Sequence, residues 1–239
     1  TLQGMQEQLF QNRNFMASVI VPDLRAACAQ APSNEAREGC AALQGWNLRN
    51  EVDARGAHVF REFWRNARNI PGVYRVPFDP QEPVATPAGL KMDDAAVAAK
   101  VWGALETAVK AIKAAGFALD APLGSVQRPA ITEAPIALHG GDEFEGVLNN
   151  LGRQEPAPIN AQGLRIDYGS SYVQTVTFDA RGPVAQAILT YGQSTNPASP
   201  HATDQMELFS RKQWHTLPFH REDVLKARVG EPLRLTVRP

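Results

Sequence analysis

The apolar residues of this chain change their spacing about half-way along it, and this change limits the fold more than any other feature. In the first half they recur every three or four residues, which is the period of an amphipathic helix. In the second half they alternate, most regularly over residues 172–178, which is the period of a strand. Helices followed by antiparallel strands predict the α+β class. Residues 1–125 are expected to be mainly helical, and residues 126–239 to be mainly strands and long loops.

Three helical regions follow from the spacing. The first begins at the N-terminus, and Pro22 predicts a kink or a break just before it. The second covers residues 54–68. The third is capped by Asp93 or Asp94 and stops at Gly116, a suitable residue for a helix C-terminus.

The strand half contains one clear hairpin, in which residues 179–182 form the turn. These strands are too few to close a sheet by themselves. We therefore expect them to join a sheet that belongs to another segment. The apolar runs interpreted as strands cover residues 131–138, 164–168, 172–178, 184–191 and 233–237.

Composition and charge exclude several classes of protein. The net charge is −1 and no basic stripe is present, so no nucleic acid is expected as a partner. No run of about 18 apolar residues occurs, so no membrane span is expected. Glycine-rich phosphate loops are absent, and the histidines lack ligand spacing, so we expect no cofactor and no metal. His58 is expected at the surface or at its boundary, and His201, His215 and His220 lie in loops.

Cys28 and Cys40 are the only cysteines, and they flank a polar segment that we interpret as a loop. Two thiols are too few for a zinc site. A disulfide is the favoured interpretation, and two buried reduced thiols are the alternative. Closing such a loop stabilises a fold by roughly 3 kcal/mol in the chain-entropy model. A disulfide also implies an oxidising compartment, so a periplasmic or secreted protein is expected.

Two features could belong to a catalytic site, and each has a simpler interpretation. The chain begins at Thr1 rather than at Met, so we expect processing to have produced this end. An N-terminal Thr can act as a nucleophile with its own amino group as the base. Thr1 precedes a helical pattern, however, and capping is favoured. The sequence His139-Gly140-Gly141-Asp142 could form an oxyanion hole, but a tight turn is favoured.

A segment without periodicity follows the hairpin and leads into a short helix with aromatic residues. We interpret it as a long ordered loop whose polar side chains bond its own backbone. Its most specific residues are Gly192, Gln193, Ser194, Ser199, Pro200, His201, Asp204 and Gln205. This pattern resembles the C-terminal signature of the penicillin acylase family.

The resemblance extends over nearly the whole chain. Residues 169–172, 217–219 and 221–224 are similar to the family's C-terminal region. Two residues depart from the family's pattern. The family often has Asp at the position of Asn47 and Gly at the position of Thr195. Residues that resemble the branch of acyl-homoserine-lactone and aculeacin acylases are Met5, Gln6, Asn12, Arg13, Cys28, Cys40, Leu43 and Trp46.

The resemblance implies an N-terminal-nucleophile hydrolase with an αββα sandwich, completed by other chain segments. Residues 1–239 would be the C-terminal portion of its β subunit. Such a precursor cleaves itself, and a new N-terminal Ser attacks the amide. That Ser would lie on another chain or segment, so no catalytic residue is expected in this chain. The implied partners are the α subunit, the N-terminal part of the β subunit and a small N-acyl amide substrate.

The expected activity is hydrolysis of the amide bond of N-acyl-homoserine lactones. A β-lactam acylase for penicillins or cephalosporins, or a cyclic-lipopeptide acylase, is the alternative within the fold. A non-catalytic structural or binding module is the alternative of another class.

Overall fold

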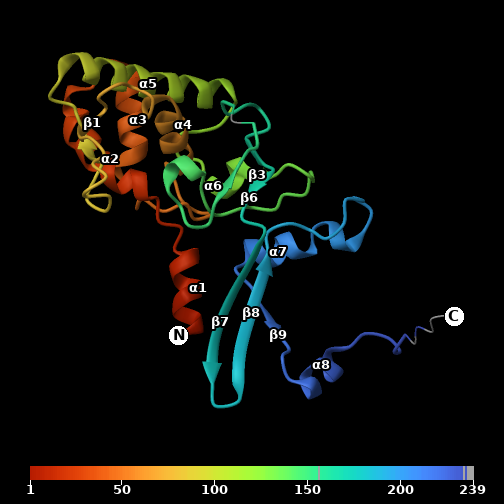
Figure 1. Cartoon of the computed structure of the whole chain (residues 1–239). Helices are drawn as coiled ribbons and strands as arrows, with labels where there is room; N and C mark the ends of the chain where they lie inside the picture. The colour runs from red at the N-terminus through yellow and green to blue at the C-terminus, as the bar shows by residue number, and fades with distance from the viewer. Residues whose placement is uncertain (156, 234, 236–239) are drawn as a thin grey trace.

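A computed structural model describes residues 1–155, 157–233 and 235, and Figure 1 shows its mixture of helices and strands. The α-helices are α1 (Leu2–Phe10), α2 (Phe15–Ala27), α3 (Asn34–Gln44), α4 (Ala57–Ala67), α5 (Ala95–Ala114), α6 (Leu123–Val126), α7 (Asp204–Ser210) and α8 (Arg221–Ala227). Short 3-10 turns are η1 (Cys28–Gln30), η2 (Glu143–Glu145) and η3 (Pro200–Ala202). The strands are β1 (Tyr74–Val76), β2 (Ala88–Leu90), β3 (Gln127–Pro129), β4 (Leu151–Gly152), β5 (Leu164–Ile166), β6 (Tyr168–Gly169), β7 (Tyr172–Asp179), β8 (Gly182–Leu189) and β9 (His215–Leu217). The α+β class, with a helical first half and antiparallel strands in the second, is confirmed.

Helices α2 to α5 pack into a helical body at one end of the molecule (Figure 1). Helix α5 contacts both α3 and α4, and it buries Val101 and Leu105 completely. A methyl group added at Gly39 of α3 would lie 2.7 Å from Leu105 Cδ1, so the two helices approach closely there. Burying each such Val or Leu side chain stabilises the fold by about 1.5–3 kcal/mol.

Helix α5 begins and ends at the residues that the sequence indicates. The Asp94 carboxylate accepts hydrogen bonds from the backbone amides of Ala96 and Val97 at 3.0 and 3.2 Å. These bonds satisfy amides that have no partner within the helix. Gly116 follows the last turn with a φ of +84°, a conformation that glycine adopts without strain. Of the two expected caps, Asp94 is the one that caps.

Two predictions about the helical half need correction, namely a break in the helix near Pro22 and a simple loop between the cysteines. Helix α2 continues through Pro22, and the break lies earlier, where Asn12 has a φ of 48°. Proline removes one backbone donor, but the buried apolar face of α2 keeps the helix continuous. Residues 29–39 are not simply a loop, because α3 begins inside them. The Ser33 hydroxyl oxygen caps α3 by accepting from Ala36 N at 3.1 Å.

The predicted hairpin is confirmed as β7 and β8, which extend away from the helical body as an arm (Figure 1). Their register runs from Tyr172 opposite Leu189 to Asp179 opposite Gly182. Strand β9 pairs antiparallel with the other edge of β8. Helix α1 lies along the arm, where Gln6 Nε2 donates to Thr175 Oγ1 at 3.1 Å.

A second hydrophobic cluster holds the arm to the body. It collects side chains from α1, the strands and α7, and the Phe10 ring lies 5.8 Å from the Phe209 ring in an edge-on arrangement. Its buried members are Phe10, Ile136, Leu138, Leu151, Ile166, Ile188, Met206 and Phe209. The arm is therefore anchored at its base and carries α8 near its tip (Figure 1).

The strand predicted at 131–138 is absent from the structure. The Arg165 guanidinium bonds the backbone there, donating to the carbonyls of Ala130 and Thr132 at 3.1 and 2.8 Å. Ser210 Oγ donates to the Ala137 carbonyl at 2.6 Å, so side chains bond two of the backbone carbonyls of this segment. Strand β3 lies just before this segment and pairs with β5 in parallel. The strand pairs of the second half are therefore not all antiparallel.

The strand predicted at 233–237 includes residues 234, 236 and 237, which lie outside the described part of the chain. None of the described helices is long and apolar enough to cross a bilayer.

Candidate functional site

The candidate site is a buried ion pair between helix α4 of the helical body and the η2 turn. Arg61 on α4 and Glu145 in η2 are 4% and 0% exposed, and Arg61 Nε donates to Glu145 Oε2 at 2.7 Å. Two charges removed from water are stable only where further hydrogen bonds satisfy them. Most of the other atoms at this site serve that purpose.

Amide groups complete the shell around the Glu145 carboxylate. Asn14 Nδ2 and Asn50 Nδ2 donate to Oε1 at 2.8 and 3.1 Å. The backbone amide of Asp142 donates to Oε2 at 2.7 Å, so Glu145 also caps the short η2 turn. With Arg61, the carboxylate receives four hydrogen bonds, which is close to its full capacity.

The guanidinium of Arg61 is satisfied on its other side by β3 and the loop after it. Arg61 donates to the Gln127 side-chain oxygen and to the Gly140 carbonyl, the latter at 3.3 Å. Gln127 Nε2 donates in turn to the carbonyls of Leu138 and Gly140 at 3.0 and 3.2 Å. The pair therefore ties α4 to the loop that contains His139-Gly140-Gly141-Asp142.

His139 is the centre of a second, adjacent network. Its Nδ1 lies 3.0 Å from Asn149 Nδ2 and 3.2 Å from Asn12 Nδ2, and its Nε2 lies 3.0 Å from the Phe209 carbonyl. The ring stacks on Phe209 at 4.6 Å. Burial lowers the pKa of His139 to about 4, so it is neutral at ordinary pH. Both ring nitrogens have partners, and neither is free to accept a proton from a substrate.

The glycine loop is a turn, and its amides are occupied. Gly140 N donates to the Asn50 carbonyl at 2.8 Å, and Gly141 N donates to the Asn149 carbonyl at 3.1 Å. An oxyanion hole needs backbone donors that are free to bind a substrate. The oxyanion-hole interpretation of residues 139–142 is therefore excluded. Within the described residues, these two networks contain no hydroxyl or thiol nucleophile beside a free base.

Of the eight motif residues predicted after the hairpin, six lie in one folded loop that includes η3, and Asp204 and Gln205 begin α7 after it. The backbone amides of Gln193 and Ser194 both donate to the His201 carbonyl, at 2.8 and 3.2 Å. A Cβ at Gly192 would overlap the Ala202 carbonyl, so only glycine fits there. The loop therefore closes on itself across seven intervening residues of irregular chain.

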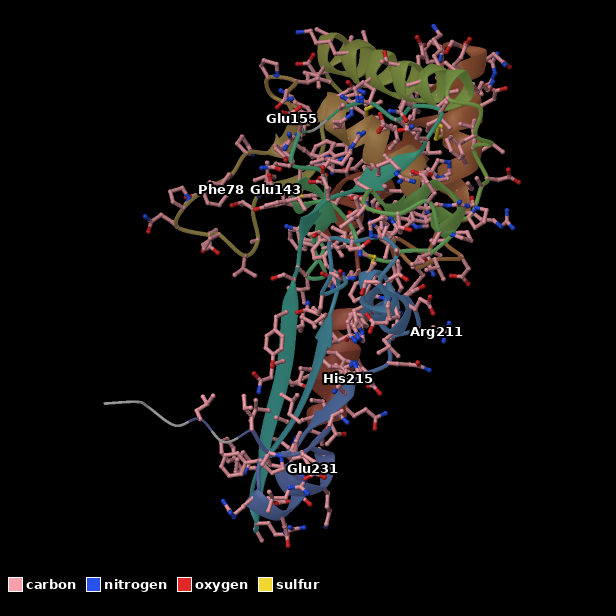
Figure 2. The ribbon with its side chains drawn as sticks, turned by 90° about the vertical axis from the view of Figure 1, so that its right-hand side faces the viewer. Phe78, Glu143, Glu155, Arg211, His215 and Glu231 are labelled. Atoms are coloured by element: carbon pink, nitrogen blue, oxygen red, sulfur yellow. A yellow bond between two sulfur atoms is a disulfide. The ribbon has the colours of Figure 1, made fainter. Side chains whose placement is uncertain are left out.

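Side chains pin the far end of this loop. Ser199 Oγ accepts from His201 N at 3.2 Å, just before Pro200 opens η3. His201 Nδ1 lies 2.9 Å from Asp204 Oδ2, and this hydrogen bond lowers the pKa of Asp204. Gln205 Oε1, in the first turn of α7, lies 3.0 Å from His215 Nε2 on β9, and Figure 2 labels His215 in the arm. The His201–Asp204 pair is exposed, and its contacts make it part of the loop's framework.

Thr1 and the cysteines also have structural roles. Thr1 Oγ1 accepts from Gly4 N at 3.1 Å and caps α1, as the capping interpretation expects. Cys28 and Cys40 are joined in a disulfide with a Cα–Cα distance of 5.8 Å. The disulfide connects the end of α2 to α3 in the helical body.

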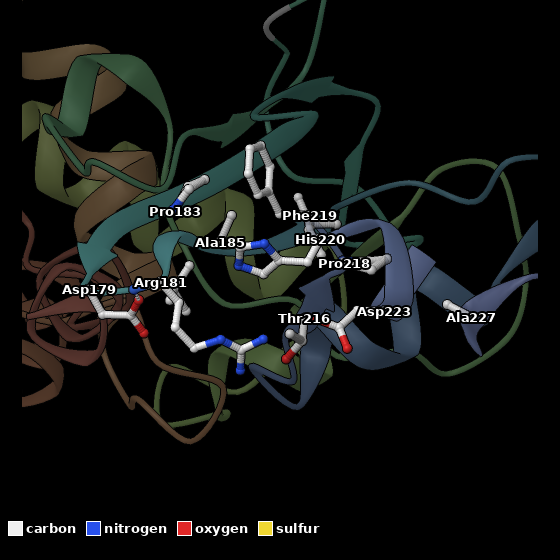
Figure 3. A pocket seen from close by; sticks show the side chains of 12 residues that line it. Asp179, Arg181, Pro183, Ala185, Thr216, Pro218, Phe219, His220, Asp223 and Ala227 are labelled. Atoms are coloured by element: carbon white, nitrogen blue, oxygen red, sulfur yellow. Dashed lines mark hydrogen bonds between the residues drawn. The ribbon is translucent and has the colours of Figure 1, made fainter. Parts of the chain in front are cut away.

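A hollow of about 400 Å³ lies at the tip of the arm, between the hairpin and α8 (Figure 3). Its lining includes the apolar side chains of Pro183, Ala185 and Leu217 and the charged side chains of Arg181 and Asp223. Its lining residues belong to the hairpin turn, β9 and α8, and Figure 1 shows the turn and α8 at the far end of the arm from the helical body. Its lining contains no buried charge that would hold a ligand.

The remaining histidine prediction needs a correction. His58 was expected at the surface or its boundary, but it is buried, as are most residues of α4. Its Nε2 lies 3.1 Å from the Ala118 carbonyl, and burial lowers its pKa to about 4. No cluster of three metal-ligating side chains occurs among the residues that the structure describes.

Sequence reasoning missed the Arg61–Glu145 site. A signal was present, however, since Ala57, Phe60 and Trp64 place Arg61 within their apolar stripe at helical spacing. An arginine in such a position needs a buried partner.

Comparison with known proteins identifies the chain's relatives. A family model described as penicillin amidase matches residues 1–226. The acyl-homoserine lactone acylase PvdQ of Pseudomonas syringae pv. syringae is 34% identical over 94% of this chain. Aculeacin-A acylase of Actinoplanes utahensis is 30% identical over 88% of it.

These matches cover only part of each relative. The chain spans 29% of the length of the Pseudomonas protein and 26% of the Actinoplanes protein. A thermostable penicillin G acylase from Alcaligenes faecalis is similar in structure over 100% of this chain and 50% of its own, with a TM-score of 0.47 and 14% identity. Since the family model covers nearly the whole sequence, this chain belongs to the penicillin amidase family.

Proposed function

We propose that this chain is the C-terminal part of the β subunit of an acylase that hydrolyses the amide bond of N-acyl-homoserine lactones. The observation that carries the proposal is the 34% identity over 94% of the chain to an acyl-homoserine lactone acylase. The chain spans 29% of the length of that relative, and we place the nucleophile in the part of the protein outside this chain.

In the proposed reaction, an N-terminal Ser on another chain or segment attacks the acyl carbonyl, with its own amino group as the base. The homoserine lactone leaves as an amine after receiving a proton. Water then hydrolyses the acyl-Ser ester and releases the fatty acid. The chain described here would brace the pocket through its two buried networks and complete the αββα sandwich, and no cofactor is required.

A second candidate within the family is an acylase for cyclic lipopeptides or β-lactams. The 30% identity to aculeacin-A acylase favours the lipopeptide form of this alternative. A non-catalytic module is the alternative of another class. Substrate assays on the complete protein separate all three.

We further propose that the protein acts in the periplasm or outside the cell. The disulfide between Cys28 and Cys40 supports this location, because such bonds persist in oxidising compartments. The proposed partners are the α subunit and the N-terminal part of the β subunit of the same precursor.

The test begins with the complete precursor, purified and analysed by intact mass spectrometry and N-terminal sequencing. We expect a companion polypeptide that begins with Ser. Release of homoserine lactone from long-chain N-acyl substrates is then measured by chromatography beside aculeacin A and penicillin G. Faster hydrolysis of either of the latter would assign the alternative, and hydrolysis of none would leave the non-catalytic module.

A further inference from the structure

His139 is completely buried at the place where the arm meets the helical body. It belongs to the loop that Arg61 and Gln127 tie to α4, and its contacts on the other side are with the base of the arm. Its Nε2 lies 3.0 Å from the carbonyl of Phe209 on α7. Its ring lies 4.6 Å from the Phe209 ring and 5.0 Å from the ring of Phe10 at the end of α1. One imidazole therefore joins the body to both α7 and α1.

The hydrogen bonds around His139 fit the neutral ring and not the charged one. Because the Phe209 carbonyl can only accept, Nε2 carries the proton, and Nδ1 accepts from Asn149 Nδ2 at 3.0 Å. A second proton would point Nδ1–H at this amide group, which can only donate. Asn12 Oδ1, at 3.3 Å from Nδ1, already accepts from Asn149 Nδ2 at 3.1 Å, so it offers the added proton only a long, shared bond.

The charged groups that act on His139 compensate each other. Lys212, just after α7, disfavours a charged ring, and Glu51, before α4, favours it. These two side chains pair with each other at 2.6 Å. In the adjacent network, Arg61 and Glu145 are likewise paired. Among the described residues, a proton on His139 would therefore be a buried charge without a counter-ion, and its cost is relieved when the ring reaches water.

We propose that His139 is an acid-sensitive latch at the base of the arm, and that its protonation releases α7 and the end of α1 while the helical body stays folded. In the closed joint, burial lowers the pKa of His139 from 6.5 to about 4. In an open joint the ring would be solvated, and its pKa would return to the ordinary 6.5. The open state binds the proton more tightly, so opening increases as the pH falls below 6.5 and levels off below 4.

Proton linkage gives the size of this effect. With these two pKa values, the opening equilibrium is about 30-fold larger at pH 5 than at pH 7.5, and about 150-fold larger at pH 4. An open joint would also loosen the bracing of the pocket, so activity should fall reversibly in acid. This last step rests on the proposed function, whereas the opening itself does not.

The test is hydrogen exchange of the complete processed enzyme, measured on peptides by mass spectrometry and corrected for the intrinsic pH dependence of amide exchange. Between pH 7.5 and 5, protection of peptides from α7 and the end of α1 should fall about 30-fold, while peptides from α4 and α5 keep theirs. In His139→Gln, protection of α7 should no longer depend on pH. If α7 of the wild type keeps its protection down to pH 4, or if α4 and α7 lose protection together, the latch is rejected.

His58→Gln is the matched control. His58 is also completely buried and burial lowers its pKa to about 4, but it lies on α4 and contacts the Ala118 carbonyl in the segment after α5. This variant should leave the pH dependence of α7 unchanged, and equal behaviour of the two variants would overturn the proposal. Should His139→Gln not fold, a histidine NMR titration of the wild type decides. His139 should take up its proton over the pH range in which α7 opens, and a ring that stays neutral there rejects the latch.

Hydrolysis of acyl-homoserine lactones is measured in parallel, at pH 5 and after return to pH 7.5. Activity that falls and recovers with α7 protection supports regulation by the latch, and activity that is insensitive to opening rejects that regulation. An enzyme that shows the expected exchange but hydrolyses no acyl-homoserine lactone at any pH would reject the proposed function and keep the latch.

Discussion

Replacing Glu145 with Gln should destabilise the protein strongly, because it leaves a buried cation without its counter-ion. The Arg61 guanidinium is 4% exposed and donates to Glu145 at 2.7 Å. Gln offers one oxygen where the carboxylate offers two, so its amide nitrogen would face groups that can only donate. These donors are the side-chain amides of Asn14 and Asn50, or Arg61 and the backbone amide of Asp142.

The expected loss is about 3–5 kcal/mol, the range observed when one partner of a buried pair is removed. That is a large fraction of the 5–15 kcal/mol that ordinarily separates folded from unfolded states. Removing both charges should not restore the protein. In Arg61→Met with Glu145→Met, the side-chain nitrogen of Asn50 and the side-chain oxygen of Gln127 would remain buried without these partners, at about 1–3 kcal/mol each.

The assay is urea unfolding of the complete enzyme, followed by tryptophan fluorescence. Trp64, one turn after Arg61 on α4, is 1% exposed and reports on this region directly. The matched control is Glu207→Gln, since Glu207 pairs with Arg211 on the surface at 3.3 Å. Such exposed pairs contribute about 0–1 kcal/mol. If Glu145→Gln costs no more than the control, our account of the buried pair is wrong.

Three further predictions use the same unfolding assay. The protein should keep full stability above pH 6.5 and lose up to about 3 kcal/mol between pH 6.5 and 4 from His139. The unfolded histidine binds a proton in that range, whereas burial lowers the folded pKa to about 4. Burial also lowers the pKa of His58 to about 4, so His139→Gln should remove only the part of the slope that His139 contributes, and an unchanged profile would contradict the assignment. Gly192→Ala should cost about 1–3 kcal/mol because its Cβ would overlap the Ala202 carbonyl, whereas Gly103→Ala, with open space around it on α5, should be neutral or stabilising. Reducing the Cys28–Cys40 disulfide, which closes a separation of 12 residues, should lower the unfolding free energy by about 3 kcal/mol, and an unchanged urea midpoint in dithiothreitol would refute this.

Local chemistry made the regular elements predictable. Asp94 and Gly116 mark the ends of α5, and the alternation over 172–178 with its turn marks the hairpin. These signals depend on residues that are close in the sequence, so they can be recognised without knowledge of the fold. The same is true of the Thr1 cap.

The misassigned elements depended on distant contacts. Residues 131–138 look like a strand, but side chains distant in the sequence, Arg165 and Ser210, bond the carbonyls of Thr132 and Ala137. Pro22 looks like a helix break, but packing within the helical body keeps α2 continuous. His58 was expected at the surface or its boundary, because the sequence alone does not show how many neighbours pack around α4. Propensity is a weak guide wherever tertiary packing decides.

The Arg61–Glu145 site is the extreme case of this dependence. Asn14, Asn50 and Arg61 lie 131, 95 and 84 residues before Glu145, and all reach one carboxylate. Such a network forms only after the helical body has closed on the loop beside it, because each partial version leaves a buried charge unsatisfied. The site also lacks any group free for chemistry. Damage to it should therefore reduce the amount of folded enzyme, while turnover per folded molecule stays the same, and this separates bracing residues from catalytic ones.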